Sequence, residues 1–110
     1  MTKPKAKNIL KIVRDALRHS RYVFSKHAFT RRNERNISYG DVLYVLENGW
    51  REEKKDEWKE EFQDWNYAIR GKTKDGVRVR ISVAVQELKD GTFVVIVTVI
   101  NLDMRRDINE

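Results

Sequence analysis

The chain has 110 residues and a net charge of +6, because 23 lysines and arginines outnumber 17 aspartates and glutamates. This length predicts one domain, residues 1–110, with a single core, and it excludes a long cleft between two domains. The absence of cysteine excludes disulfides, iron–sulfur clusters and cysteine-based zinc sites. The two histidines, His19 and His27, cannot form a structural metal site by themselves.

The hydrophobic stretches are short. No apolar stretch of the signal-peptide type follows the basic N-terminus. The longest apolar run, Phe93–Ile100, falls well short of the ~20 residues that a membrane-spanning helix needs. We therefore expect a cytoplasmic protein that makes no contact with a membrane.

The charges are distributed unevenly along the chain. Residues 1–36 carry eleven lysines or arginines against two acids, residues 37–65 carry four against nine, and residues 66–110 carry eight against six. The basic first third favours binding to a nucleic-acid backbone through counterion release. A lysine-rich surface that only confers solubility explains the same charge, so both interpretations stay open. The acidic stretch from Glu52 to Asp64 is typical of a solvated loop or short helix.

Helical patterns begin the chain. In residues 7–19 the apolar residues form one stripe of a predicted helix, at Ile9, Leu10, Ile12, Val13, Ala16 and Leu17. The apolar residues Tyr22–Phe24 predict a short link between helices. Ser25 is then a suitable N-cap for a second helix, Lys26–Asn36.

A third helix is predicted over Tyr39–Asn48. Ser38 is a suitable N-cap for it, and Asp41 lies near its positive end. Gly49 follows directly, which favours a left-handed helix stop.

The second half of the chain has the periodicity of strands. Trp50–Glu53 predicts a short edge strand and Trp65–Arg70 a longer one. Val77–Gln86 alternates apolar and polar residues, as a half-buried strand does, and Phe93–Leu102 is apolar on both faces, as in a covered central strand. Two turn sequences separate these strands, Lys74-Asp75-Gly76 and Lys89-Asp90-Gly91.

Helices followed by an antiparallel meander predict an α+β fold. We expect two or three N-terminal helices packed on one face of a three- to four-stranded antiparallel sheet. The other face is then partly open, and Arg78 and Arg80 project from it.

The second predicted helix carries a candidate site for phosphate chemistry. His27, Arg31 and Arg35 recur every four residues, so each lies about 40° round the helix from the last and all three share one face. Arginine binds phosphate oxygens with paired hydrogen bonds, and histidine exchanges a proton near neutral pH. Cleavage of RNA without a metal needs a base for the ribose 2′-hydroxyl, cations for the charged phosphorane and an acid for the leaving oxygen.

Further basic residues are candidates for binding the RNA backbone. Two lie on the same helix and two on the predicted sheet: Lys26, Arg32, Arg78 and Arg80. Arginines on a hairpin face are equally often ordinary outward residues, so this assignment stays open.

Structural roles explain the same kinds of residue. A histidine near the start of a helix is often a capping residue, and arginines one turn apart often pair with acids such as Glu34 or Asp41. Trp50, Trp58 and Trp65 could stack on RNA bases, but aromatic residues in an α+β domain more often pack in the core. Trp58 lies in a very polar stretch, and we expect it to be exposed.

Several motifs together resemble a known family. They are Phe24-Ser25-Lys26-His27-Ala28, Arg31, Arg35, Ile37-Ser38, Asp41-Val42, Leu46 with Gly49, Tyr67–Gly71, the Asp75-Gly76 turn, and the strand Val94–Val99 with Thr98 inside it. Over about residues 22–102 the sequence resembles the domain of unknown function 4258 family, which is placed with the RelE/ParE-like, or bacterial endoribonuclease–colicin type, fold.

The resemblance implies two or three helices against a four-stranded antiparallel sheet. It also implies a toxin of a toxin–antitoxin pair, or a toxin tip, that usually cuts RNA without a metal or other cofactor. The expected partner is an antitoxin protein, and some relatives poison DNA gyrase instead.

We consider three hypotheses, in order of preference. In the first, the protein is an endoribonuclease in which His27 is the general base or acid, Arg31 and Arg35 clamp the phosphate, and Arg78 and Arg80 guide the backbone. In the second, a non-catalytic module binds RNA or a protein, and the helix arginines pair with acids. In the third, a toxin of the gyrase-poisoning kind needs no acid–base residue. The sequence does not indicate the oligomeric state.

Overall fold

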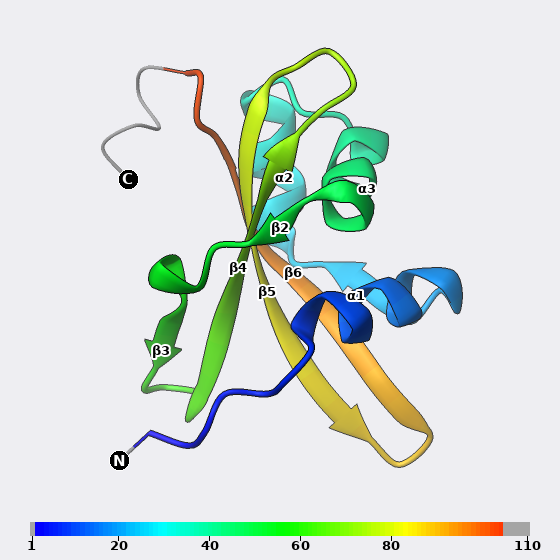
Figure 1. Cartoon of the computed structure of the whole chain (residues 1–110), viewed down its shortest axis with the longest axis vertical. Helices are drawn as coiled ribbons and strands as arrows, with labels where there is room; N and C mark the ends of the chain where they lie inside the picture. The colour runs from blue at the N-terminus through cyan, green and yellow to red at the C-terminus, as the bar shows by residue number, and fades with distance from the viewer. Residues whose placement is uncertain (1, 105–110) are drawn as a thin grey trace.

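The computed structural model describes residues 2–104. Within this range three α-helices and a mixed sheet of six strands form an α+β fold (Figure 1). In chain order the elements are α1 (Ile9–Arg18), β1 (Tyr22–Phe24), α2 (Lys26–Glu34), α3 (Tyr39–Asn48), β2 (Trp50–Arg51), the 3-10 helix η1 (Glu53–Lys55), β3 (Glu57–Lys59), β4 (Asp64–Lys72), β5 (Arg78–Leu88) and β6 (Gly91–Asn101). The α+β class is confirmed, whereas the sheet is mixed and larger than expected.

The serine caps start α2 and α3 as predicted. The Ser25 side-chain oxygen accepts a hydrogen bond from the Ala28 N–H at 3.0 Å. Ser38 and Asp41 form a capping box: each side chain accepts a hydrogen bond from the other's backbone N–H, at 3.0 and 3.1 Å. α2 ends at Glu34, two residues before its predicted end.

Gly49 ends α3, but not in the left-handed conformation that its position predicts. Its backbone is extended, with φ −83° and ψ −166°. A Cβ at this position would lie 2.6 Å from the Val45 carbonyl oxygen and would also collide with the Arg70 carbonyl oxygen. The close approach of α3 and β4, rather than turn geometry, therefore requires glycine.

The strand order is β1-β6-β5-β4-β2, with β3 paired to β4 off this path. β4, β5 and β6 form the predicted antiparallel meander. The predicted link at Tyr22–Phe24 is wrong: these residues are β1, which pairs in parallel with β6, Tyr22 opposite Val94 and Phe24 opposite Ile96. Three residues are too few to show a strand periodicity, so only the tertiary structure reveals β1.

Both predicted turns are present and contain glycine in the left-handed region. Gly76 has φ 85° and donates its N–H to the Thr73 carbonyl oxygen at 2.9 Å. Gly91 has φ 129° and begins β6. These glycines fix the register of the meander because L-residues with a side chain adopt such angles at a cost.

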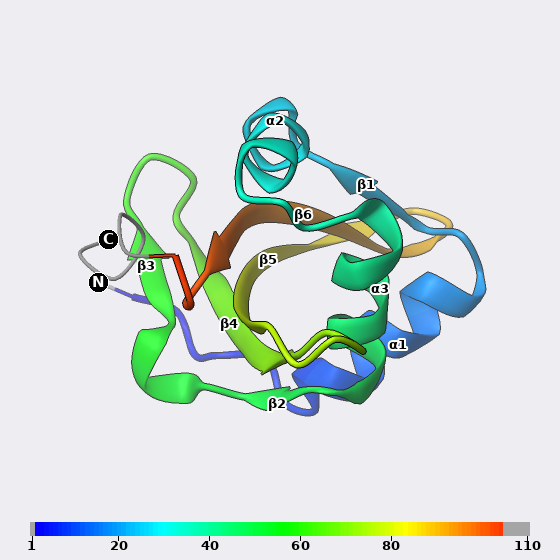
Figure 2. The same cartoon turned by 90° about the horizontal axis from the view of Figure 1, so that it is seen from above.

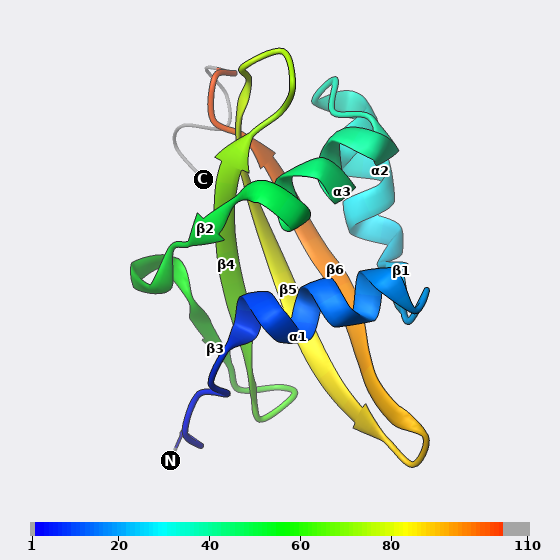
Figure 3. The same cartoon turned by 45° about the vertical axis from the view of Figure 1, so that its right-hand side comes forward.

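The core lies between the sheet and α1 and α3, which cover one sheet face (Figure 3). Val79, Ile81 and Val83 alternate along β5 and are fully buried on this face. They belong to one cluster with apolar residues of the helices, such as Val13 and Leu46. α2 is outside this layer: it lies beyond β6, on the other side of that strand from α3 (Figure 2).

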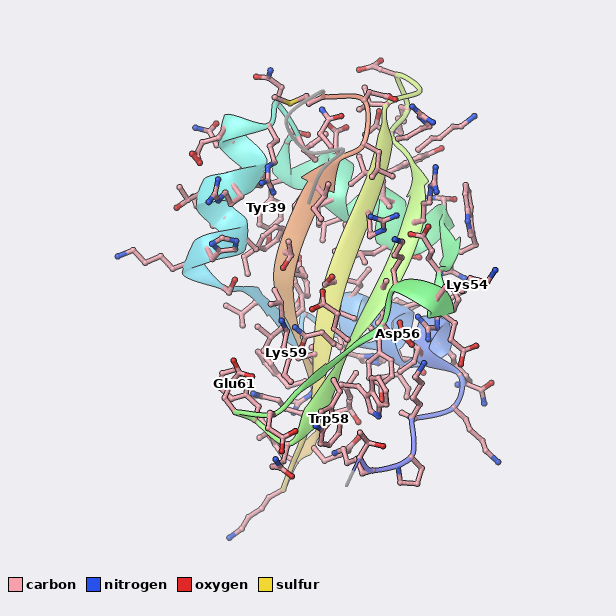
Figure 4. All side chains as sticks on the ribbon, turned by 90° about the vertical axis from the view of Figure 1, so that its left-hand side faces the viewer. Tyr39, Lys54, Asp56, Trp58, Lys59 and Glu61 are labelled. Atoms are coloured by element: carbon pink, nitrogen blue, oxygen red, sulfur yellow. The ribbon has the colours of Figure 1, made fainter. Side chains whose placement is uncertain are left out.

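The acidic stretch Glu52–Asp64, predicted to be a solvated loop or short helix, has many exposed residues and includes a short helix, but it also contains a strand. It contains η1 and β3, and it lies across the sheet face that α1 and α3 leave free (Figure 4). Trp58 is half-buried rather than exposed, because its ring packs edge-to-face on Trp65 with 5.5 Å between the ring centroids. The exposed tryptophan is Trp50.

Candidate nucleic-acid interface

α2 closes the part of the β6 edge that β1 leaves unpaired. The Ser25 N–H donates to the Ile96 carbonyl oxygen at 2.9 Å, and the Ser25 hydroxyl donates to the Val97 carbonyl oxygen at 3.1 Å. Further along, Arg35 Nη1 donates to the Val99 carbonyl oxygen at 2.6 Å. α2 thus supplies donors that an adjacent strand would otherwise provide.

Arg35 is therefore part of the framework. The residue is only 3% exposed, and its backbone carbonyl accepts a hydrogen bond from the Asn101 side chain at 2.9 Å. Arg35 stays in helical register with Arg31, because its N–H donates to the Arg31 carbonyl oxygen at 3.0 Å, but it is buried against β6 whereas His27 and Arg31 are exposed. Its guanidinium satisfies a sheet carbonyl instead of facing a ligand.

His27 and Arg31 lie on an accessible face of α2. Both are exposed, and Arg31 is 3.9 Å from Glu34, the length of a weak ion pair. Phe29 faces the β1 side of the helix, since its ring meets the Phe24 ring at 6.3 Å. Residues two apart on a helix project about 160° from each other, so His27 points to the opposite side, toward the sheet face that α1 and α3 leave free.

That sheet face, the outer face, carries the residues that alternate with the buried ones. Ser82 of β5 lies opposite Thr98 of β6. A groove of about 390 Å³ lies over the outer face between Ser25 at the start of α2 and Phe62 in the β3–β4 turn. Its lining is mainly apolar and includes Val97, and Phe62 is 76% exposed. The groove therefore has the N-cap residue of α2 on one side and the β3–β4 turn on the other.

Glu52 binds two arginines on the outer face. Its carboxylate accepts hydrogen bonds from Arg80 at 2.6 and 3.1 Å and from Arg70 at 3.1 Å. The Arg80 hydrogen bond lowers the pKa of Glu52 more than burial raises it, and Arg70 lowers that pKa further. Because two guanidiniums share one carboxylate, the cluster keeps a net positive charge. Arg80 projects on the predicted face, but it is not a free cation.

Asp56 anchors the acidic segment to β4. Its side chain is 0% exposed, with Arg51 Nη2 at 2.6 Å and Lys5 Nζ at 3.1 Å. A carboxylate oxygen also accepts the Ala68 N–H at 2.8 Å. Burial raises the pKa of Asp56, but the hydrogen bonds from Arg51 and Ala68 and the contact with Lys5 outweigh it and hold the pKa below its usual value. These bonds explain why the segment is ordered against the sheet.

The other predicted RNA-binding residues do not gather at one place. Lys26 is exposed at the start of α2. Arg78 is also exposed, but its Nε donates to an Asp103 carboxylate oxygen at 2.7 Å. Arg32 lies on the β1 side, with its guanidinium 4.2 Å from the Phe29 ring centroid. Of the residues predicted from sequence, the structure brings only His27 and Arg31 together on one accessible surface beside the outer face.

The site residues predicted from the sequence do not include Glu52 or Phe62. Glu52 was hidden in a run of charges, and its two arginine partners are 18 and 28 residues away. Phe62 had a usable signal, because an aromatic residue within a strongly charged stretch has little apolar surface nearby to cover it.

Two features are absent from residues 2–104. No helix within residues 2–104 has both the length and the apolar character that crossing a lipid bilayer requires. No group of three or more histidine, cysteine, aspartate or glutamate side chains in the same range is arranged to hold a metal ion.

The fold defines an α+β protein with two helices on one face of a curved mixed sheet and a third helix along the sheet edge. The family model of a domain of unknown function (DUF4258) matches residues 24–101, which is more than half of the chain, and the protein belongs to that family. The match runs from the end of β1 to the end of β6. No curated protein and no solved structure matches the chain.

Proposed function

We propose that this protein acts on RNA in the cytoplasm as the toxin-like member of a toxin–antitoxin pair, with a RelE/ParE-like fold and metal-independent endoribonuclease activity. One observation carries the proposal. His27 and Arg31, one helical turn apart, are both exposed on the side of α2 that faces the outer face. In the proposal, these two side chains supply a proton-transfer group and a phosphate-binding cation beside an open surface.

In this proposal His27 accepts the proton of a ribose 2′-hydroxyl. The resulting oxygen attacks the adjacent phosphorus, the bond to the 5′-oxygen breaks, and that oxygen takes a proton from His27 or from water. Arg31 binds the phosphate oxygens as negative charge accumulates. The products are a 2′,3′-cyclic phosphate and a 5′-hydroxyl. Arg78 and the net positive cluster of Arg80, Arg70 and Glu52 attract the RNA backbone, whereas Arg35 positions α2 and has no contact with RNA.

The test is expression of the chain alone in a bacterial host, with growth and RNA ends measured together. We expect growth arrest and new RNA ends for wild type, and loss of both for His27→Ala. Removing a general base or acid costs about 10²–10⁴-fold in rate. The matched control is His19→Ala, because His19 is also exposed but lies at the C-terminal end of α1. It should arrest growth as wild type does.

The outcomes separate the hypotheses. Cleavage that persists in purified, folded His27→Ala contradicts the catalytic assignment. Arrest with DNA-damage signalling and no RNA cleavage indicates a toxin of the gyrase-poisoning kind. Coexpression of an antitoxin protein should restore growth of the host that expresses the wild-type chain, as the toxin proposal requires.

A second candidate is a non-catalytic module that binds RNA or a protein. The observation that favours it is the engagement of arginines by the protein itself: Arg35 binds the Val99 carbonyl and Arg80 binds Glu52. This second function would be supported if the purified protein binds a labelled RNA without shortening it and expression of the chain does not arrest growth of the host.

A further inference from the structure

β1 is an edge strand with one unpaired side. It ends the strand order and pairs with β6. The Arg21 carbonyl accepts a hydrogen bond from the Val94 N–H, and the Ser25 N–H donates to the Ile96 carbonyl oxygen. In a parallel pair alternate residues direct their backbone groups to the same side, so the N–H and C=O of Val23 also point toward β6. The backbone N–H and C=O groups of Tyr22 and Phe24 therefore point away from the sheet, where the described chain places no other strand. An edge of this kind is a template for another strand.

Exposed apolar side chains gather beside this edge. Val23 of β1, Phe29 of α2 and Tyr39 of α3 are 47%, 50% and 41% exposed. The Phe24 ring stacks on Tyr39 with 4.7 Å between centroids, and the Tyr39 hydroxyl donates to the Tyr22 hydroxyl at 3.2 Å. Three separate elements thus build one fixed apolar surface, the β1-edge surface, which consists of Tyr22, Val23, Phe24, Phe29 and Tyr39.

The surroundings of the β1-edge surface are basic. Arg32 lies over the Phe29 ring, and Lys26 is exposed two residues after β1. Of the acids nearby, Asp41 of α3 is held in the capping box, and Asp90 is paired with Arg21, the residue before β1, at 3.1 Å. A second copy of the chain would bring the same positive charge to this surface and be repelled, whereas a partner with acidic side chains would be attracted.

We propose that the β1 edge binds an extended, acidic and apolar segment of a partner protein, which adds a strand to the sheet beside β1. Strand addition obtains affinity from main-chain hydrogen bonds and specificity from alternate side chains. One set of apolar side chains in the segment packs on Phe24, Phe29 and Tyr39, and the other set meets Val23. Acidic residues at its ends meet Arg32 and Lys26. The inference does not depend on the proposed function, because His27 projects on the opposite side of α2.

The first experiment is selection of a random twelve-residue peptide library, displayed on phage, against the full-length protein. We expect the selected peptides to share a run of apolar residues flanked by aspartate or glutamate. The synthetic consensus peptide is then labelled, and its Kd is measured against wild type, Val23→Lys and Leu88→Lys. Leu88 is a matched control, since it is 49% exposed and lies at the distant β5–β6 turn. Both variants replace an exposed apolar side chain with lysine and add one positive charge.

Val23→Lys should weaken binding about tenfold or more, equivalent to ~1.4 kcal/mol, and Leu88→Lys should leave the Kd unchanged. N-methylation of alternate residues in the consensus peptide supplies a second readout. Strand addition predicts that one alternate set of methyl groups abolishes binding, because it removes the N–H groups that pair with β1, while the other set is tolerated. Thermal unfolding confirms that both protein variants are folded.

Three results would overturn the inference. The first is failure of the peptide experiment, seen either as no enrichment of peptides over background or as equal binding of the peptide by wild type and Val23→Lys. The second is a concentration-dependent dimer in sedimentation that Val23→Lys abolishes, since the edge would then pair with a second copy. The third is that no peptide is selected and the protein binds a labelled RNA oligonucleotide, with this binding abolished by Phe29→Ser. The β1-edge surface would then be an RNA-binding surface.

Discussion

The acidic segment Glu52–Asp64 and helix α2 are both rich in charge, but their charges act differently. In the acidic segment the carboxylates of Glu52 and Asp56 are bound by arginines and by a backbone N–H, and they attach the segment to the sheet. On α2 the side chains of His27 and Arg31 face solvent. The difference lies in what the backbone places opposite each charge. A charge that meets a complementary group on a strand becomes structural, and one that meets water stays available for a ligand.

The strongest test of this comparison is Asp56→Asn. The change leaves Arg51 and Lys5 without their buried carboxylate, and removal of one partner of a buried ion pair costs about 3–5 kcal/mol. We expect a loss of about 3 kcal/mol in the free energy of unfolding, measured by urea denaturation. Glu53→Gln is the matched control, since its side chain is 71% exposed and should change stability by less than ~0.5 kcal/mol. Equal effects would contradict the anchoring role of Asp56.

The second test compares two arginines on either side of the end of α2. Arg35→Ala removes the hydrogen bond to the Val99 carbonyl and should lower the free energy of unfolding by about 2 kcal/mol. Arg31→Ala should change it by less than ~0.5 kcal/mol, because Arg31 is exposed. For RNA binding we expect the reverse: Arg31→Ala should weaken the binding of a labelled oligonucleotide, and Arg35→Ala should leave it unchanged. The binding is measured under conditions where both variants are folded. Loss of stability in Arg31→Ala would place that residue in the framework too.

The third and smallest effect is the dependence of stability on pH. The pKa of Glu52 is lower in the folded protein, mainly because Arg80 donates to it, and the pKa of Asp56 is lowered as well. Their contribution is present above the unfolded-state pKa, about 4, and is lost as the pH falls through the lower folded-state values. The melting temperature should therefore decrease as the pH is lowered below about 5, and this decrease should be less steep for Glu52→Gln than for wild type. Parallel curves would show that Glu52 has no part in the loss.

The local parts of the fold follow from the sequence, and the long-range parts do not. Ser25, Ser38 and Gly76 have roles set by a few neighbouring residues, so their positions predict the caps and a turn correctly. The role of Gly49 depends on β4, which approaches it from residues beyond position 60 in the chain. Sequence therefore predicts that a glycine is needed there and gives the wrong reason.

The candidate site shows the same division. Helical spacing correctly places His27 and Arg31 on one face. The same spacing keeps Arg35 one turn from Arg31, but it does not reveal that β6 lies against this part of the helix and offers a carbonyl oxygen to the Arg35 guanidinium. Neither the helix end nor the position of β6 can be derived from the interval between the three residues.

The attachment of α2 to β6 also has a consequence for synthesis of the protein. The Ser25 hydroxyl and the Val97 carbonyl that it binds are 72 residues apart in the chain. At about 5–20 residues per second, a ribosome needs roughly 4–14 s to add the intervening residues, and part of the chain then still lies in the exit tunnel. During that interval α2 has no strand to hold it, and the edge of the sheet is incomplete. The surface that carries His27 and Arg31 is therefore assembled only after β6 has been synthesised, and a nascent or truncated chain that lacks β6 cannot present it.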